Sequence, residues 1–153
     1  MIGSAGFGGN VVTPYVQEVQ KLVEKAGERV KFTGYIENQK LYRYYQSADI
    51  QVIPSLWEEA AGLIAIEGML SGLPLIITKS GGMIEYAPSN VAVWIDRDNI
   101  IPNLEAAITQ LADDKEKRKE MSELSLERAK EFPKKKFYED YIEVFEYERI
   151  GER

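Results

Sequence analysis

Two glutamates eight positions apart are the residues of this sequence best suited to chemistry. Glu59 comes just before an expected helix, and Glu67 lies within that helix. The neighbours of Glu67 are mostly apolar, which predicts a core helix, and an unpaired carboxylate is costly in a protein core. We therefore expect Glu67 to have a partner, either a basic residue in a buried ion pair or a ligand.

The start of the same helix favours a phosphate as part of that ligand. Gly62 stands at the expected start, where backbone N–H groups lack intrahelical partners and can receive an anion. Glu67 follows five residues later, roughly 7–8 Å along a helix that rises about 1.5 Å per residue. That length is comparable to the reach from a sugar-linked phosphate to the ribose of a nucleoside diphosphate. Glu67 could then accept hydrogen bonds from ribose hydroxyls, and Glu59 could accept them from a transferred sugar.

The elements that would position these residues alternate between strand and helix patterns. Strands are expected at residues 1–2, 30–33, 50–53, 75–78 and 91–94, and helices at 13–27, 38–46, 62–72, 82–86, 99–112, 114–131 and 133–147. Such alternation predicts an α/β fold, with a Rossmann-like parallel sheet and helices on both faces. The mixed-charge run from 113 to 136 is most simply a solvated helix face.

Composition bounds the function. The chain has 153 residues, 44% of them hydrophobic, which suits one domain with its own core. The net charge of −6 argues against nucleic acid as a partner. Cysteine and histidine are absent, which excludes disulfides, thiolate metal sites and histidine-dependent nucleophiles. We find no apolar run long enough to cross a membrane and no signal peptide, so a cytoplasmic location is the default expectation.

Taken together, the motifs closely resemble those of retaining GT-B glycosyltransferases, in particular glycosyltransferase family 4. Glu59 and Glu67 match the family's Glu-x7-Glu motif. Further matches lie at residues 30–36, 47–50, 54–55, 71–76 and 81–85, and the resemblance covers roughly residues 1–145. The sequence departs from the family at Ala61, where most members have Phe, and at Gly68, where most have Ala. We expect both changes to shrink side chains near the donor, which leaves the sugar open.

The resemblance implies transfer of a hexose from a UDP-, GDP- or ADP-sugar to an acceptor hydroxyl, with retention of the anomeric configuration. It implies donor contacts for Glu59, Gly62, Leu63, Glu67, Gly34, Tyr35, Ile36, Gly81 and Gly82. Glu59 would be the catalytic residue that orients the sugar, and Glu67 would hold the ribose. Tyr35 and Ile36 would face the nucleobase, although ordinary core packing explains them equally well. No cofactor and no essential metal are implied, and the setting would be polysaccharide, lipopolysaccharide or glycolipid biosynthesis.

The resemblance also implies that residues 1–153 are only part of an enzyme, the donor-binding C-terminal lobe without its first strand–helix unit. That unit carries an Arg and a Lys in the family, whereas no basic residue precedes Lys21 here. The acceptor-binding N-terminal lobe would be missing too, and the helix at 133–147 would pack toward it. We expect the isolated domain to be inactive, and any contact with the inner face of a membrane to occur through the missing lobe.

Other interpretations remain open. The glycines of residues 3–9 do not follow G-x-G-x-x-G, which disfavours NAD or FAD. Asp96-Arg97-Asp98 could hold a divalent ion, but Asp is also common in turns and caps before a helix. Glu58 is expected to be an ordinary exposed acid favoured by the helix dipole. The main alternative function is a non-catalytic nucleotide-binding module, and a weaker one is a sugar-nucleotide epimerase, an activity that typically needs histidine.

Overall fold

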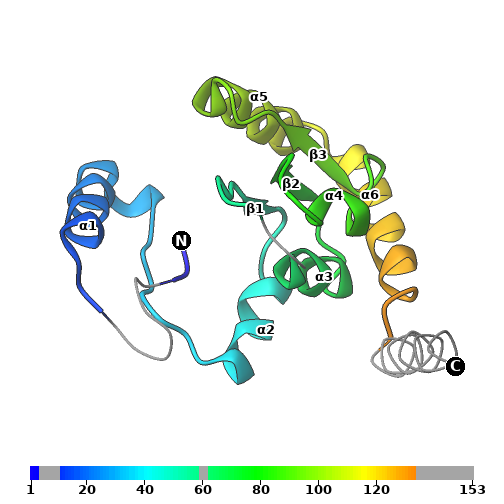
Figure 1. Cartoon of the computed structure of the whole chain (residues 1–153), viewed down its shortest axis with the longest axis horizontal. Coiled ribbons are helices and arrows are strands. Elements are labelled where there is room, and N and C mark those ends of the chain that lie inside the picture. Colours follow the sequence, from blue (N-terminus) through cyan, green and yellow to red (C-terminus); the bar gives the residue numbers. More distant parts are fainter. Residues whose placement is uncertain (4–10, 59–61, 134–153) are drawn as a thin grey trace, which may run out of the picture. The chain divides into compact units, whose positions relative to one another are not determined.

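The computed structural model describes residues 1–3, 11–58 and 62–133, and it divides into two compact units, residues 1–46 and 47–153 (Figure 1). The expected last helix at 133–147 therefore lies almost entirely outside the described residues.

The first unit is helical. It contains α1 (Pro14–Ala26), the short 3-10 helix η1 (Gly27–Arg29) and α2 (Asn38–Gln46). The hydroxyl of Thr13 caps α1 by accepting a hydrogen bond from the Val16 N–H at 3.2 Å. Proline follows the cap, and Gly27 ends the helix with a φ of 64°. The expected helices at 13–27 and 38–46 are thus confirmed.

The expected strands at residues 1–2 and 30–33 are wrong. Both segments are irregular, although backbone hydrogen bonds join them: the Thr33 N–H donates to the Met1 carbonyl, and the Gly3 N–H donates to that of Gly34, each at 3.0 Å. Gly34 has a φ of 70°, which turns the chain at the point where a ladder would continue. Residues 1–3 and 30–34 are therefore joined by backbone hydrogen bonds without forming a sheet.

The second unit is built on a parallel three-stranded sheet with the order β1-β2-β3. Its strands are β1 (Gln51–Ile53), β2 (Leu75–Thr78) and β3 (Ala92–Ile95), and its helices are α3 (Leu63–Leu70), α4 (Met83–Tyr86), α5 (Ile100–Asp113) and α6 (Lys115–Ala129). Each agrees with an expected element to within a few residues. In the register, Val52 pairs with Ile76, and Ile76 with Val93.

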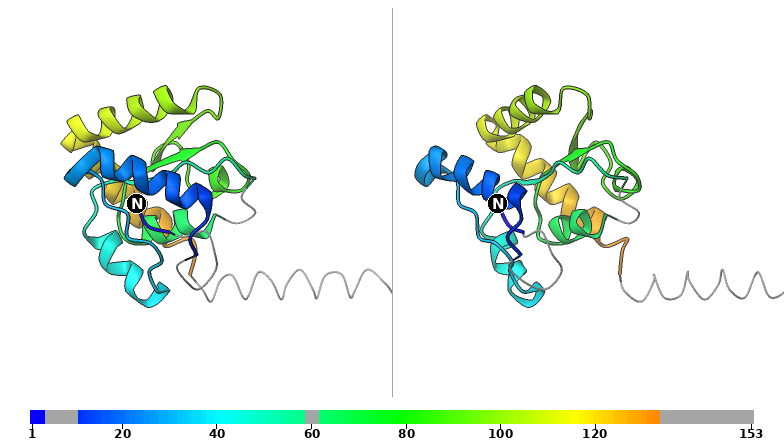
Figure 2. Two further views of the ribbon diagram at one scale, coloured as in Figure 1. Left: turned by 90° about the vertical axis from the view of Figure 1, so that its left-hand side faces the viewer. Right: turned by 60° about the vertical axis from the view of Figure 1, so that its left-hand side comes forward.

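Helices α3 and α5 cover opposite faces of this sheet (Figures 1 and 2). On one face, Gly68 of α3 packs against the side chains of Gln51 and Leu75. On the other face, Ile76 and Ile95 form a buried cluster with residues of α5 and α6. The central strand β2 is consequently buried along its whole length. The predicted parallel sheet with helices on both faces is confirmed.

Helix α6 fixes the chain segment that enters β2. The Ser125 hydroxyl is fully buried and donates a hydrogen bond to the Leu73 carbonyl at 3.0 Å. Met121, one turn earlier, joins the apolar cluster on the α5 face. The outer side of the helix is charged and exposed, as the mixed-charge run predicted.

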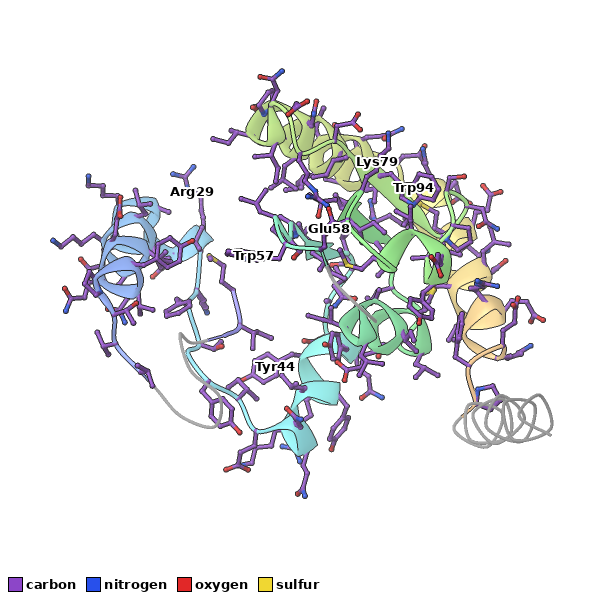
Figure 3. All side chains as sticks on the ribbon, in the orientation of Figure 1. Arg29, Tyr44, Trp57, Glu58, Lys79 and Trp94 are labelled. Atoms are coloured by element: carbon purple, nitrogen blue, oxygen red, sulfur yellow. The ribbon has the colours of Figure 1, made fainter. Side chains whose placement is uncertain are left out.

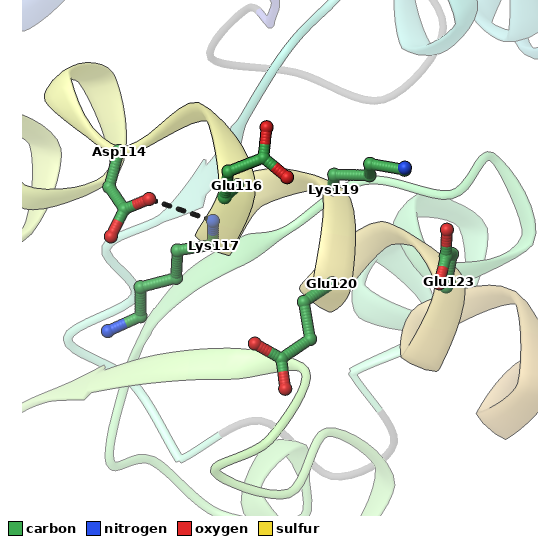
Figure 4. A pocket seen from close by; sticks show the side chains of 6 residues that line it. All are labelled: Asp114, Glu116, Lys117, Lys119, Glu120 and Glu123. Carbon is green, nitrogen blue, oxygen red and sulfur yellow. Dashed lines mark hydrogen bonds between the residues drawn. The ribbon is translucent and has the colours of Figure 1, made fainter.

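We expect removal of the α6 cap to weaken the second unit. Asp114 accepts a hydrogen bond from the Lys117 N–H at 2.8 Å, drawn as a dashed line in Figure 4. Asp114→Ala should lower the free energy of unfolding by about 1 kcal/mol, the usual effect of losing a helix cap. Urea denaturation would measure the loss. Asp113→Ala is the matched control, because that neighbouring carboxylate is exposed at the end of α5, and an equal loss in it would contradict the cap.

Candidate functional site

The loops that follow the three strands share one edge of the sheet, because parallel strands end on the same side. Residues 54–58 follow β1, residues 79–82 follow β2 and residues 96–99 follow β3. Two buried hydroxyls tie the first of these loops to the second: Thr78 donates to the Ser55 carbonyl and Ser80 donates to the Trp57 carbonyl. Clefts at this edge are where open α/β sheets bind ligands.

Glu58 links all three loops. One of its carboxylate oxygens accepts a hydrogen bond from the Gly81 N–H at 2.6 Å, and the other pairs with the Arg97 guanidinium. Glu58 and Lys79 are labelled in Figure 3. Glu58 is exposed, as expected, but it has specific partners, which an ordinary surface acid would lack. Its partners lie 23 and 39 residues away in sequence, so no local pattern could have indicated them.

These contacts give a titration that can be tested. The hydrogen bond from Arg97, then the one from the Gly81 N–H, hold the pKa of Glu58 below its ordinary value. The carboxylate therefore keeps its partners at neutral pH, and the interaction is lost only as the pH falls through this lowered pKa. Other charged groups in the same loops are Lys79, Asp96 and Asp98.

Arg97→Met should raise the pKa of Glu58 toward the ordinary carboxyl range. Carbon-13 NMR titration of the side-chain carboxyl of Glu58 would measure the change. Asp96→Asn is the control, because Asp96 pairs with Lys79 (2.9 Å) in the neighbouring ion pair. A Glu58 pKa that is insensitive to Arg97 but moves with Asp96 would contradict the assignment.

The segment Asp96-Arg97-Asp98, a possible metal site in the sequence, is held by contacts with neighbouring side chains. Asp96 and Arg97 are both in ion pairs, with Lys79 and Glu58. The backbone carbonyl of Asp98 accepts a hydrogen bond from the Asn103 side chain at 2.9 Å. Within residues 1–3, 11–58 and 62–133, acidic side chains do not gather into a cluster that could hold a metal ion.

The start of α3 lies against the start of α4. Gly62 is buried and has a φ of 52°, and a Cβ added there would lie 2.5 Å from Cγ of Met83. Only glycine permits both this backbone conformation and this approach. The contact brings Gly62 and Leu63 beside the loop that contains Gly81 and Gly82. These four predicted donor-binding residues are therefore gathered at the carboxyl edge of the sheet.

Helix α4 is held from its other end by Arg128 of α6. The guanidinium donates to the carbonyls of Glu85 and Tyr86 at 2.8 and 3.0 Å. It also lies 4.9 Å from the centre of the Phe132 ring, which meets Tyr86 edge-on. The glycine loop before α4 is thus attached to a short helix whose carboxyl end is fixed.

Glu67 is exposed, so the predicted buried carboxylate is wrong. Leu63 and Leu70, two apolar residues of the same expected core helix, are 65% and 59% exposed. The buried residues of α3 are instead the smaller Ala65 and Gly68, together with Met69. Because the helix is apolar on every side, periodicity could not identify the face that packs on the sheet. Glu67 keeps its place one turn beyond the helix start.

Gly68 corrects a second expectation. Its missing side chain was expected to lie near the donor, but a Cβ there would lie 1.7 Å from the side-chain oxygen of Gln51 and 2.9 Å from Leu75. The Gln51 amide donates to the Ile64 carbonyl at 3.1 Å. Gly68 therefore makes room for a polar side chain between α3 and β1, which is a feature of packing.

The remaining predicted residues fall elsewhere. Gly34, Tyr35 and Ile36 belong to the first unit, where they are partly buried between the contact with residues 1–3 and helix α2. Glu59 and Ala61 lie outside the described residues. The structure consequently brings four of the predicted residues together, and their role in donor binding stays a prediction, as does the role of Glu59.

Two surface hollows of the second unit lie at α6 and along β3. One is lined by acidic and basic side chains at the start of α6, namely Asp114, Glu116, Lys117, Lys119, Glu120 and Glu123 (Figure 4). Its mixed charges are those of a solvated helix face. Another runs along β3 and includes Lys79, Trp94 and Met121. Among the described residues, none of the helices has the length and apolarity needed to cross a bilayer.

The parallel sheet, the helices on both faces and the glycine-rich carboxyl edge define a Rossmann-like domain of the kind found in GT-B glycosyltransferases. The chain belongs to the family described as glycosyl transferases group 1, whose model matches residues 5–128.

Curated relatives agree with this assignment. Spore coat protein SA of Bacillus subtilis is 29% identical over 150 residues, which cover 97% of this chain and 40% of that protein. The D-inositol 3-phosphate glycosyltransferase of Corynebacterium diphtheriae is 29% identical over 133 residues, covering 86% of this chain and 30% of that enzyme. The chain thus spans 40% or less of the length of these two relatives.

Solved structures share the fold. The sucrose-phosphate synthase of Thermosynechococcus elongatus superposes with a TM-score of 0.74 at 26% identity, over 87% of this chain and 35% of that one. HepE of Anabaena, in complex with UDP and glucose, gives a TM-score of 0.81 at 21% identity, over 95% of this chain and 39% of that one. The predicted GT-B lobe is confirmed as a fold.

Proposed function

We propose that this chain is the donor-binding part of a retaining glycosyltransferase of family 4, which transfers a hexose from a nucleoside-diphosphate sugar to an acceptor hydroxyl. The observation that carries the proposal is the approach of Gly62 to Met83, which sets the start of α3 beside the Gly81-Gly82 loop. This is the edge of the sheet where such folds bind ligands. Membership of the glycosyl transferases group 1 supports the reaction class.

In this proposal the donor diphosphate lies at the start of α3. Gly62 carries no side chain that could cap the helix, so the N–H groups of Leu63 and Ile64 can face the phosphates. Glu67 would accept hydrogen bonds from the ribose, and its exposure leaves it accessible for that role. Glu59 would orient the sugar.

Charge stabilisation by these backbone groups would let the diphosphate leave without an essential metal ion, and catalysis would consist mainly of positioning. A uridine nucleotide is the first donor to test, because the similarly folded HepE has been solved with UDP and with UDP-glucose.

We also propose that residues 1–153 work together with an acceptor-binding lobe, as in a two-lobe enzyme of cell-surface polysaccharide or glycolipid synthesis. The support is that the chain spans only 30–40% of the length of the two relatives described above. The isolated chain should then bind the donor without transferring the sugar.

Isothermal titration with UDP, GDP and ADP, each alone and as its glucose conjugate, tests this function. We expect one nucleotide to bind, with an affinity that is the same with magnesium and with a chelator. Binding to none of them would contradict a donor site. A metal-dependent affinity would contradict the metal-free mechanism, and equal affinity for the nucleotide and its sugar conjugate would favour a non-catalytic binding module.

A further inference from the structure

We infer that Glu58 and Arg97 are positioning residues, which hold the Gly81-Gly82 loop in the conformation that receives the donor sugar. The inference rests on the proposed function. Arg97 comes from the loop after β3, Glu58 from the loop after β1, and Gly81 from the loop after β2. One carboxylate therefore joins all three loops at the edge proposed to bind the donor.

The loop that Glu58 holds needs such a contact. Gly81 has a φ of 49° and is followed by a second glycine, so this segment has more backbone freedom than other residue pairs. Ordering a residue costs conformational entropy. A loop that is already ordered by the 2.6 Å hydrogen bond from the Gly81 N–H to Glu58 avoids this loss when the sugar binds.

Arg97 in turn keeps Glu58 in place. Its guanidinium pairs with one carboxylate oxygen, which leaves the other directed at Gly81. Its Nε is buried and has no hydrogen-bond partner among the described residues. A buried unpaired donor is unfavourable, so the arginine is not placed in the way that best serves stability. Its guanidinium also offsets a carboxylate that would otherwise repel a diphosphate at this edge.

The attachment of the loops to each other does not depend on this pair. Thr78 and Ser80 are buried and join the β2 segment to the loop after β1, and the Lys79–Asp96 ion pair joins the loops after β2 and β3. The Glu58 side chain is 69% exposed and that of Arg97 is 34% exposed, and ion pairs that water reaches contribute little to folding. Loss of the pair should therefore change the geometry of the glycine loop and leave thermal stability nearly unchanged.

The test compares the affinity for UDP-glucose with the affinity for UDP, by titration calorimetry on the full chain. Glu58→Gln and Arg97→Met should each weaken UDP-glucose binding by about tenfold, the order expected from one lost charge-assisted interaction. The inference assigns the glycine loop to the sugar, so the affinity for UDP should change by less than about twofold. Arg97→Lys, which keeps the charge, should retain part of the affinity for UDP-glucose relative to UDP, which we call the sugar preference. Asp96→Asn is the matched control, since it breaks the neighbouring Lys79–Asp96 pair at the same edge.

The outcomes separate this inference from the function on which it rests. If the unmodified chain binds UDP-glucose but the Glu58 and Arg97 variants lose both ligands equally, or neither, the inference is overturned and the donor site stands. Loss of the sugar preference in Asp96→Asn to the same extent would also overturn it. If the unmodified chain binds none of the nucleotides or their conjugates, the proposed function and the inference both fail. GDP-glucose with GDP, or ADP-glucose with ADP, replaces the uridine pair if that base is the one bound.

Discussion

Glu67→Ala should weaken binding of the nucleotide by about 1.5–3 kcal/mol, the range for hydrogen bonds that involve a charged group. The loss is expected because the carboxylate, placed one turn beyond the start of α3, would accept hydrogen bonds from the ribose hydroxyls. Titration calorimetry with the nucleotide that the unmodified chain binds would measure the change. The nucleotide affinity of Glu67→Gln should fall between those of the unmodified chain and Glu67→Ala, since the amide keeps one acceptor and loses the charge.

The matched control is Glu123→Ala, which removes an exposed carboxylate from α6 and lowers the net negative charge equally. Since Glu67 is also exposed, neither substitution should shift the unfolding midpoint by much. An affinity that Glu67→Ala leaves unchanged would rule out the ribose contact, and an equal change in both variants would reduce it to an effect of net charge.

Gly68→Ala should destabilise the second unit by about 1–3 kcal/mol, the usual range for overpacking a core. The new methyl group would stand 1.7 Å from the side-chain oxygen of Gln51, so the amide must move and give up its hydrogen bond to the Ile64 carbonyl. The gain in helix propensity from glycine to alanine, about 1 kcal/mol, offsets part of the loss. Urea denaturation would measure the difference.

Gln51→Ala should rescue this variant. Removing the amide vacates the space that the methyl group needs and also removes a buried oxygen that lacks a hydrogen-bond partner among the described residues. A double-mutant cycle should therefore show a coupling of about 0.5–3 kcal/mol between the two positions, as expected for residues in contact. Additive effects would show that Gln51 is not the group that alanine displaces.

Some elements of this fold could be predicted from local sequence signals and others could not, for physical reasons. Local signals were sufficient where neighbouring residues determine the structure of a segment. Thr13 with Pro14 located the start of α1, and the apolar residues of β2 located the central strand. Periodicity failed for α3, because a helix without a polar face gives no indication of its orientation. Its small residues packed inward, since they allow the helix to approach the sheet closely, and Glu67 was left at the surface.

The candidate site shows the same division. The glycines of the motifs could be located from their spacing, and the structure gathers Gly62, Leu63, Gly81 and Gly82. The link through Glu58 could not be predicted, because Arg97 lies 39 residues away and approaches only when β1, β2 and β3 lie side by side. Interactions that depend on sheet order carry no local signal.

The burial of β2 determines when the carboxyl edge of the sheet should unfold. The strand is central, fully covered, and leads directly into Lys79, Ser80 and Gly81. Amide protons in such a strand exchange with solvent only when the whole unit opens, whereas those of loops exchange through small local fluctuations. The glycine loop therefore directly follows β2, the strand that we expect to open last. If unfolding begins at the helices that cover the sheet, the carboxyl edge of the sheet should stay folded until the final cooperative step.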